Sequence, residues 1–192
     1  MLKFLSKIGF WIFGWKLGKY DFESVNRCVM IAAPHTSNWD LYFARCAFFL
    51  MGIPLRFTIK KEWFKFPANL LIGPLGGIAI DRSPKPGLTR KRSMVDAMAD
   101  LFEENEELSV MVTPEGTRSK VTRWRSGFYN VAVKAGVPIG LGYLDYKNKV
   151  AGVGKMVYPT GDFKADMKII NDFYKDIEGK HPEKFSLHQI KE

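Results

Sequence analysis

Residues 29–40 have the sequence VMIAAPHTSNWD. The first five, Val29–Ala33, form a short apolar run that ends at a proline, which is typical of a buried strand. Asp40–Met51 is apolar and aromatic and contains neither glycine nor proline, which predicts a helix. A strand that passes through a short polar turn into a helix is the building unit of an α/β fold.

Strands and helices continue to alternate along the chain. Apolar runs predict further strands at residues 55–59, 78–80, 108–112, 138–144 and 150–157. Helical spacing predicts helices within residues 88–107 and over residues 128–134. A closing amphipathic helix is indicated by Met167, Ile170, Phe173 or Tyr174, and Ile177. We therefore expect a single α/β domain, a mostly parallel sheet flanked by helices, with its ligand where strands end and helices begin.

The composition limits the possible partners. The 192 residues are 46% hydrophobic, which excludes a disordered or collagen-like chain, and 29 Lys and Arg against 20 Asp and Glu give a net charge of +9. This charge favours an anionic membrane, a phosphorylated small molecule or a nucleic acid. The basic residues are scattered rather than interleaved with aromatic residues, which argues against nucleic acid. Two cysteines and three histidines match no common zinc pattern, so we expect no metal.

Residues 1–20 form a candidate membrane anchor. They hold four Lys, six aromatic residues and no acid, and the longest apolar stretch, Ile8–Trp15, is shorter than the roughly 20 residues that span a bilayer. On a helix, one broad apolar face would carry Leu5, Ile8, Trp11, Ile12 and Trp15. We expect an interfacial amphipathic helix over residues 1–20 and the main domain over residues 21–192. The alternative is a core helix that covers the domain's own sheet.

The first junction between a strand and a helix carries His35 and Asp40. A carboxylate held against one imidazole nitrogen fixes the tautomer, and the other nitrogen can then take a proton from a hydroxyl. Ser37 allows a Ser-His-Asp alternative, although no strained elbow surrounds it. In a second alternative, Asp40 or Asn38 simply caps the helix.

Two further junctions could bind an anion. Residues 76–82, GGIAIDR, deliver Arg82 to the end of a strand, where its guanidinium suits a phosphate or carboxylate unless Asp81 pairs with it. Residues 113–118, TPEGTR, place Glu115 and Arg118 in the turn after another strand. Backbone N–H groups beside Gly116 could point at the same anion, or Thr117 could cap a helix.

Together these junctions resemble the lysophosphatidic acid acyltransferase family, the 1-acylglycerol-3-phosphate acyltransferases and their relatives. The matching elements are His-x4-Asp at residues 35–40, Gly-x-x-x-Asp-Arg at 77–82, Pro-Glu-Gly-Thr-Arg at 114–118 and Val-Pro-Ile at 137–139. The resemblance spans about residues 29–145, and the order and spacing of the four elements make it specific.

The resemblance implies acyl transfer from acyl-CoA or acyl carrier protein to a hydroxyl of a lysophospholipid. It makes His35 the general base and Asp40 its orienting acid. It assigns the acceptor phosphate to Arg82 and to Glu115, Gly116, Thr117 and Arg118 of the third motif, and it adds Lys60 and Lys61 of the Lys-Lys-Glu sequence to the substrate site. A thioester is already activated, so we expect no metal or other cofactor. The enzyme is expected to be peripheral, at the cytoplasmic face of an anionic membrane.

Two departures from the family pattern leave the acceptor open. Pro34 stands where the family often has Asn, and Ala79 stands where it often has Phe. A lyso-aminolipid such as an ornithine or glycine lipid is therefore the alternative acceptor. A remote alternative for the function itself is a basic nucleic-acid-binding module. Residues 146–192 carry no recognised motif, so loss of His181 or His188 is expected to be nearly silent.

Overall fold

A computed structural model describes residues 2–18, 23–60, 66, 67, 70, 73, 76–80, 83 and 92–190. Its strands are β1 (Lys16–Leu17), β2 (Arg27–Ala32), β3 (Leu55–Lys60), β4 (Gly77–Ile80), β5 (Leu108–Val112), β6 (Ile139–Asp145) and β7 (Val150–Val157). Its α-helices are α1 (Leu2–Phe13), α2 (Trp39–Met51), α4 (Met94–Glu104), α5 (Gly127–Ala135) and α6 (Phe163–Tyr174). The sequence-based strands and the α/β class are confirmed.

Among the described residues, seven strands form one sheet in the order β1-β7-β6-β2-β5-β3-β4. Every pair of neighbours is parallel except β6 and β7, which form an antiparallel hairpin. The sheet is therefore mostly parallel, as predicted. The strands that carry the first and third motifs, β2 and β5, are direct neighbours, with Ile31 opposite Val112.

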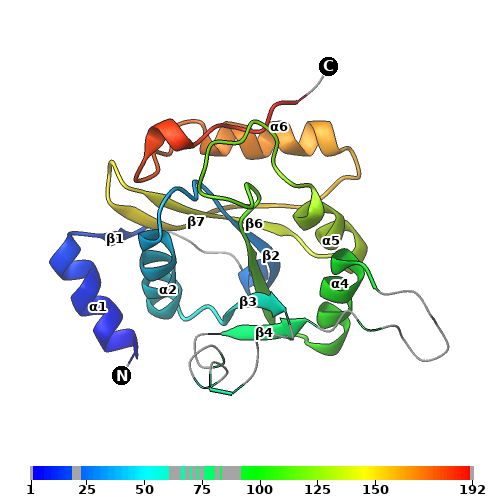
Figure 1. The fold of residues 1–192 in the computed structure, drawn as a ribbon, viewed down its shortest axis with the longest axis horizontal. Helices are drawn as coiled ribbons and strands as arrows, with labels where there is room; N and C mark the ends of the chain where they lie inside the picture. The colour runs from blue at the N-terminus through cyan, green and yellow to red at the C-terminus, as the bar shows by residue number, and fades with distance from the viewer. Residues whose placement is uncertain are drawn as a thin grey trace.

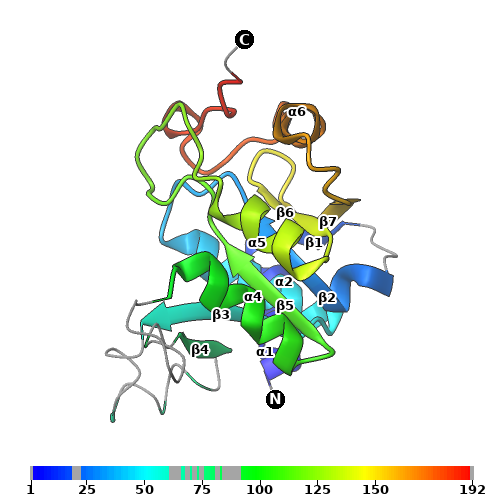
Figure 2. The same ribbon diagram turned by 90° about the vertical axis from the view of Figure 1, so that its right-hand side faces the viewer.

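Helices cover both faces of the sheet, as Figures 1 and 2 show. Alternate residues of β2 point to opposite faces. Val29 and Ile31 belong to the core under α4, α5 and α6, whereas Cys28 and Met30 belong to the core under α1 and α2. Strand β2 is buried on both faces, and its sequence is therefore a continuous hydrophobic run rather than an alternation of apolar and polar residues.

The carboxyl ends of β2, β5 and β6 meet at one edge of the sheet. The parallel registers pair Ile31 with Val112 and Ala32 with Gly142. The residues that follow β5 and β6 are therefore brought to those that follow β2, although they are about 80 to 110 positions away in the sequence. This edge is where ligands bind in parallel α/β sheets.

Helix α1 buries only one side, and it is not the side with the most apolar residues. Phe10 and the following Trp15 are 4% and 7% exposed and pack in the core with α2. Trp11 and Ile12 are 81% and 63% exposed. The core-helix alternative therefore holds for Phe10 and Trp15, while most of the predicted apolar face points outward. No helix in the described part of the chain is long and apolar enough to cross a membrane.

The C-terminal tail folds back onto the domain and gives His188 a structural role that its sequence did not indicate. The Trp124 backbone N–H donates to Nδ1 of His188 at 2.9 Å, and the Trp124 indole N–H donates to the Ser186 carbonyl oxygen at 3.0 Å. His188 is only 7% exposed. The side chain of His181, in contrast, is 42% exposed. The periodicity of the sequence could not reveal these two bonds, because each joins a side chain to a backbone group of a distant residue.

Candidate active site

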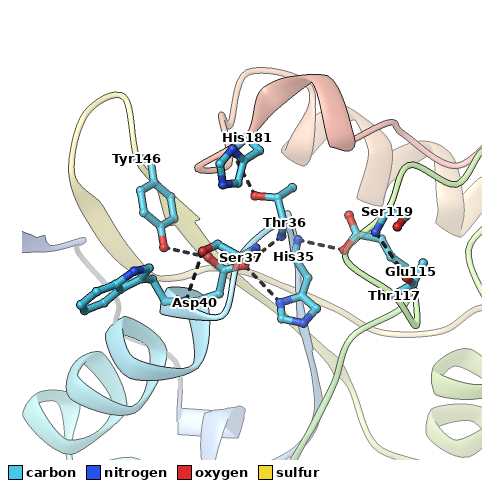
Figure 3. A network of polar contacts seen from close by, with 10 residues as sticks. His35, Thr36, Ser37, Asp40, Glu115, Thr117, Ser119, Tyr146 and His181 are labelled. Carbon is cyan, nitrogen blue, oxygen red and sulfur yellow. Dashed lines mark hydrogen bonds and ion pairs between the residues drawn. The ribbon is translucent and has the colours of Figure 1, made fainter.

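His35 and Asp40 face each other across the turn between β2 and α2 (Figure 3). Nδ1 of His35 lies 3.1 Å from Oδ2 of Asp40. The same oxygen accepts the backbone N–H groups of Thr36 and Ser37, both at 2.8 Å. Asp40 therefore closes the turn and contacts the imidazole at once, whereas Asn38 makes no side-chain cap. The Ser37 hydroxyl accepts the Trp39 N–H at 3.2 Å, so it also stabilises the start of α2.

Asp40 is built to stay ionised. It is 5% exposed. Burial opposes ionisation, but hydrogen bonds from His35, Tyr146 and the Ser37 backbone outweigh it and hold the pKa of Asp40 below its usual range. An ionised Asp40 keeps a proton on Nδ1 of the imidazole, and Nε2 is then the nitrogen with a free lone pair. The pair can therefore accept a proton at Nε2.

Glu115 joins the first motif to the third. Its Oε2 accepts the His35 backbone N–H at 2.8 Å, and the residue is only 6% exposed. Burial, with a smaller contribution from the charge of Asp40, raises the pKa of Glu115 to about 8. This carboxyl group faces the backbone of the His35 turn, so it connects the turn after β5 to the turn after β2.

Gly116 and Arg118 shape a polar pocket beside His35. The pocket has a volume of about 380 Å³, and its walls are His35, Thr113, Gly116, Thr117, Arg118 and Ser119. Gly116 has a φ of +68°, a backbone conformation that favours glycine, and a Cβ there would lie 2.6 Å from Nε of Arg125. The Gly116 N–H already donates to the Thr113 carbonyl oxygen at 3.1 Å. Among the residues of these walls, Arg118 carries a guanidinium, the kind of group that suits an anion.

An apolar cavity of about 340 Å³, lined by residues of α2 and of the sheet, also borders His35. Leu41, Ala44, Ala47, Phe48 and Met51 of α2 form one wall, and the opposite wall includes Ala32, Met111, Gly142 and Leu144. His35 and Asp40 line one end of it. His35, Thr113 and Arg118 line both the cavity and the polar pocket, so the imidazole stands where an apolar site meets a polar one.

The structure brings most of the predicted site residues together. His35, Asp40, Gly116, Thr117 and Arg118 all surround these two cavities. Thr117 accepts the Ser119 N–H at 3.3 Å and so stabilises the turn, while the next helix begins only at Gly127. Lys61 and Arg82, like the side chain of Lys60, lie outside the described residues. In the described ranges, no group of three or more His, Cys, Asp or Glu side chains could hold a metal ion.

Tyr146 is a site residue that the sequence analysis missed. Its hydroxyl donates to Oδ1 of Asp40 at 2.7 Å. Tyr146 directly follows β6, just as His35 and Glu115 follow β2 and β5 by a few residues. The signal that could have found it is the same one: a polar group at the carboxyl end of a buried strand.

Two comparisons place this chain among known proteins. The model of the Acyltransferase protein family matches residues 18–140, more than half of the sequence, and the chain belongs to that family. The crystal structure of the 1-acyl-sn-glycerophosphate (LPA) acyltransferase PlsC from Thermotoga maritima shares its fold, with a TM-score of 0.57 and 19% sequence identity over 93% of this chain and 80% of that one. No curated protein matches the sequence significantly. The resemblance drawn from the four motifs is thereby confirmed, and the chain is an acyltransferase.

Proposed function

We propose that this acyltransferase moves a fatty acyl group from acyl-CoA or acyl carrier protein to a hydroxyl of a lysophospholipid such as 1-acylglycerol-3-phosphate. The observation that carries the proposal is the position of His35. With Asp40 on Nδ1, its imidazole lies between an apolar cavity and a polar pocket that contains an arginine. An acyl chain and an anionic headgroup need such a pair of sites on either side of the base.

The reaction follows from the chemistry of the pair. Nε2 of His35 takes the proton from the acceptor hydroxyl as its oxygen attacks the thioester carbonyl carbon. Asp40 stabilises the imidazolium that forms, because its charge faces Nδ1. The tetrahedral intermediate collapses: the carbon–sulfur bond breaks, the new ester remains, and the imidazolium returns its proton to the thiolate. No covalent enzyme intermediate is needed, since the donor is already activated.

The two cavities give each substrate a place. The acyl chain lies in the apolar cavity along α2, with the thioester at the His35 end. The acceptor's phosphate lies in the polar pocket, where Arg118 offers a two-pronged guanidinium that matches phosphate oxygens. Arg82, Lys60 and Lys61 remain candidates for the same anion on the basis of the sequence motifs.

An acceptor panel tests this assignment. Purified enzyme is mixed with labelled acyl-CoA or acyl carrier protein and, in turn, 1-acylglycerol-3-phosphate, a phosphate-free lysolipid and a lyso-aminolipid, and the products are identified by mass spectrometry. The proposal predicts preferential acylation of 1-acylglycerol-3-phosphate. Preferential acylation of the lyso-aminolipid would instead assign the polar pocket to a carboxylate headgroup.

We further propose that the enzyme binds an anionic membrane peripherally, at the cytoplasmic face. Supporting this is an apolar patch, formed by Phe4, Leu5, Ile8, Trp11 and Ile12 of α1 and by Trp39, Leu41 and Tyr42 of α2, all of which are exposed. Phe13 connects the two helices through ring contacts with Trp39 and Tyr42. Leu41 also lines the apolar cavity, so lipids at the patch would lie beside the entrance to the acyl site.

Vesicle flotation tests the membrane proposal. Deleting residues 1–20 would remove the buried Phe10 and Trp15, so point substitutions are the better design. Phe4→Ser, Trp11→Ser and Ile12→Ser combined should abolish flotation with vesicles containing phosphatidylglycerol without lowering Tm. The matched control changes exposed apolar residues elsewhere, Val133→Ser on α5 and Ile169→Ser on α6. Flotation that survives the triple change would place the membrane contact on another surface.

A further inference from the structure

The two carboxylate oxygens of Asp40 have different kinds of partner. Oδ2 meets only groups of its own turn, Nδ1 of His35 and the N–H groups of Thr36 and Ser37. Oδ1 accepts the hydroxyl of Tyr146 at 2.7 Å, from a residue 106 positions away in the sequence. Figure 3 shows the Tyr146 side chain reaching Asp40 from the side opposite His35. One long-range bond thus fixes the oxygen that does not contact the imidazole.

Tyr146 is itself held firmly. It is the first residue of the turn between β6 and β7, and its backbone N–H donates to the Glu178 carbonyl oxygen at 2.9 Å. The Asp145 carboxylate closes this turn by accepting the N–H groups of Lys147 and Asn148 at 3.1 and 3.3 Å. The turn therefore presents the Tyr146 hydroxyl in a fixed place even without substrate.

Two aromatic rings fix the orientation of the Tyr146 ring. Trp15 meets it edge-on with the ring centroids 4.9 Å apart, and Phe43 of α2 meets it edge-on at 6.0 Å. Trp15 also stacks on Phe43 at 4.6 Å. Such contacts restrict ring rotation and tilt. The hydroxyl consequently has one available direction, toward Asp40.

A neutral hydrogen-bond donor to Oδ1 holds the Asp40 carboxylate without cancelling its charge. The carboxylate torsion of Asp is broad, and the bond from Tyr146 to Oδ1 restrains it further, beside the contacts that Oδ2 makes within its own turn. An arginine or lysine would hold Oδ1 but would cancel the negative charge that the imidazolium needs. Burial and the contact with Asp40 keep the pKa of Tyr146 well above its ordinary value, so the hydroxyl remains a donor and adds no charge.

We propose that Tyr146 is a positioning residue of the active site, whose hydroxyl fixes the Asp40 carboxylate so that Oδ2 stays aligned with Nδ1 of His35. This inference rests on the proposed function, in which His35 is the general base. Tyr146 touches neither substrate in this scheme and acts only through Asp40. Its loss should therefore change kcat and leave both KM values nearly unchanged.

The first test compares Tyr146→Phe with Tyr129→Phe. The Tyr129 hydroxyl also donates to a buried carboxylate, Oδ2 of Asp166 at 2.7 Å, but on α5 and away from the site. Both variants lose one hydroxyl and keep the ring. Tyr129→Phe also removes the acceptor of the Gly161 N–H at 3.1 Å, so its Tm should fall at least as far as that of Tyr146→Phe. Only Tyr146→Phe should lower kcat, by about tenfold, because misalignment of a catalytic group is costly even when small. An unchanged kcat, or an equal fall in both variants, would overturn the inference.

A double-mutant cycle tests the route of the effect. If the hydroxyl acts through Asp40, then Tyr146→Phe should change kcat by less than about twofold in an Asp40→Asn background. An equal loss in both backgrounds would mean that Tyr146 acts by another route. This arm needs only the residual activity of Asp40→Asn.

A spectroscopic measurement separates this inference from the proposed function. Nitrogen-15 NMR of the His35 ring at alkaline pH shows which ring nitrogen holds the proton, whether or not the protein is active. Wild type should hold it on Nδ1, and Tyr146→Phe should increase the share on Nε2, while Tyr129→Phe should not. Identical spectra would overturn the positioning role. An inactive wild type with the expected spectra would instead overturn only the proposed function.

Discussion

The backbone N–H of His35 donates a 2.8 Å hydrogen bond to Oε2 of Glu115 and so ties the turn after β2 to the turn after β5. Two of the four sequence motifs are thus joined by a single buried contact. The carboxyl group of Glu115 is directed at the protein rather than at an acceptor phosphate, which it would repel if ionised. Its place in the motif is best explained by how it positions the His35 turn.

The raised pKa of Glu115 predicts a pH-dependent stability. The folded protein holds this proton up to a pKa of about 8, whereas the ordinary value is 4.5. The folded state thus binds more protons than the unfolded state between these limits, so stability falls as pH rises through this window, by at most about 1.4 kcal/mol per pH unit. Glu115→Gln keeps an acceptor for the His35 N–H and cannot ionise. Urea unfolding from pH 5 to 8 should show a smaller fall for Glu115→Gln than for wild type, and parallel curves would contradict this.

Arg118 should determine acceptor affinity. A charge-assisted contact with phosphate is worth roughly 1.5–3 kcal/mol. Arg118→Ala should therefore raise the KM for 1-acylglycerol-3-phosphate by at least about tenfold, with a much smaller change in donor KM. Arg118→Lys should recover only part of the loss, since an ammonium lacks the fork.

The control for Arg118 is Arg123→Ala. Arg123 is exposed in the same loop but does not line the polar pocket, so this variant removes the same charge. It should leave the acceptor KM almost unchanged. If both variants weaken the acceptor equally, or if Arg118→Ala weakens phosphate-bearing and phosphate-free acceptors alike, then Arg118 is not a phosphate ligand.

The apolar cavity should limit acyl-chain length. Leu41, Ala44, Ala47 and Met51 line it along one side of α2, and about 1.5 Å per residue makes this wall roughly 15 Å long. Ala47→Leu should shorten the space and displace the far end of a long acyl chain. Each methylene group that is kept out of an apolar site loses about 0.8 kcal/mol of binding free energy. If two methylene groups are displaced, kcat/KM for long donors should fall about tenfold. Short donors should be unaffected, and an equal fall at every chain length would argue against this site.

His188 should matter for stability although it carries no motif. His188→Ala leaves the buried Trp124 N–H without its acceptor, and an unsatisfied buried donor costs about 1–3 kcal/mol. His181→Ala, which removes a half-exposed ring, should change the free energy of unfolding very little. Chemical denaturation of both variants checks this, and equal stability of the two would show that the tail contributes nothing through His188.

The strands and most of the site could be predicted because both depend on local patterns. Apolar runs located β2, β5, β6 and β7 to within a few residues, and the carboxyl-end rule located His35, Asp40 and Arg118. The antiparallel direction of β7 and the short β1 depend on pairing between distant segments, which spacing does not encode. For α1, the sequence placed Leu5, Ile8, Trp11 and Ile12 on an apolar face that the structure leaves exposed. It did not show that Phe10 and Trp15 pack in the core with residues of α2, because this packing depends on distant segments.

Tyr146 and His188 show the same limit within the site and the tail. The side chain of each makes a hydrogen bond to a residue more than 60 positions away. Neither is surrounded by a motif, and only the fold brings its partner into reach. Sequence spacing therefore predicted the residues that repeat a family pattern and missed those that support them.

Single-turnover acyl transfer by His35→Ala shows whether His35 is the general base. Loss of a general base costs roughly 10²–10⁴ in rate, so transfer from acyl-CoA to 1-acylglycerol-3-phosphate should fall by at least about 100-fold while Tm changes little. His181→Ala, with its exposed ring, should transfer at the wild-type rate. A His35→Ala protein that is folded and turns over at a near-normal rate would mean that His35 is not the general base.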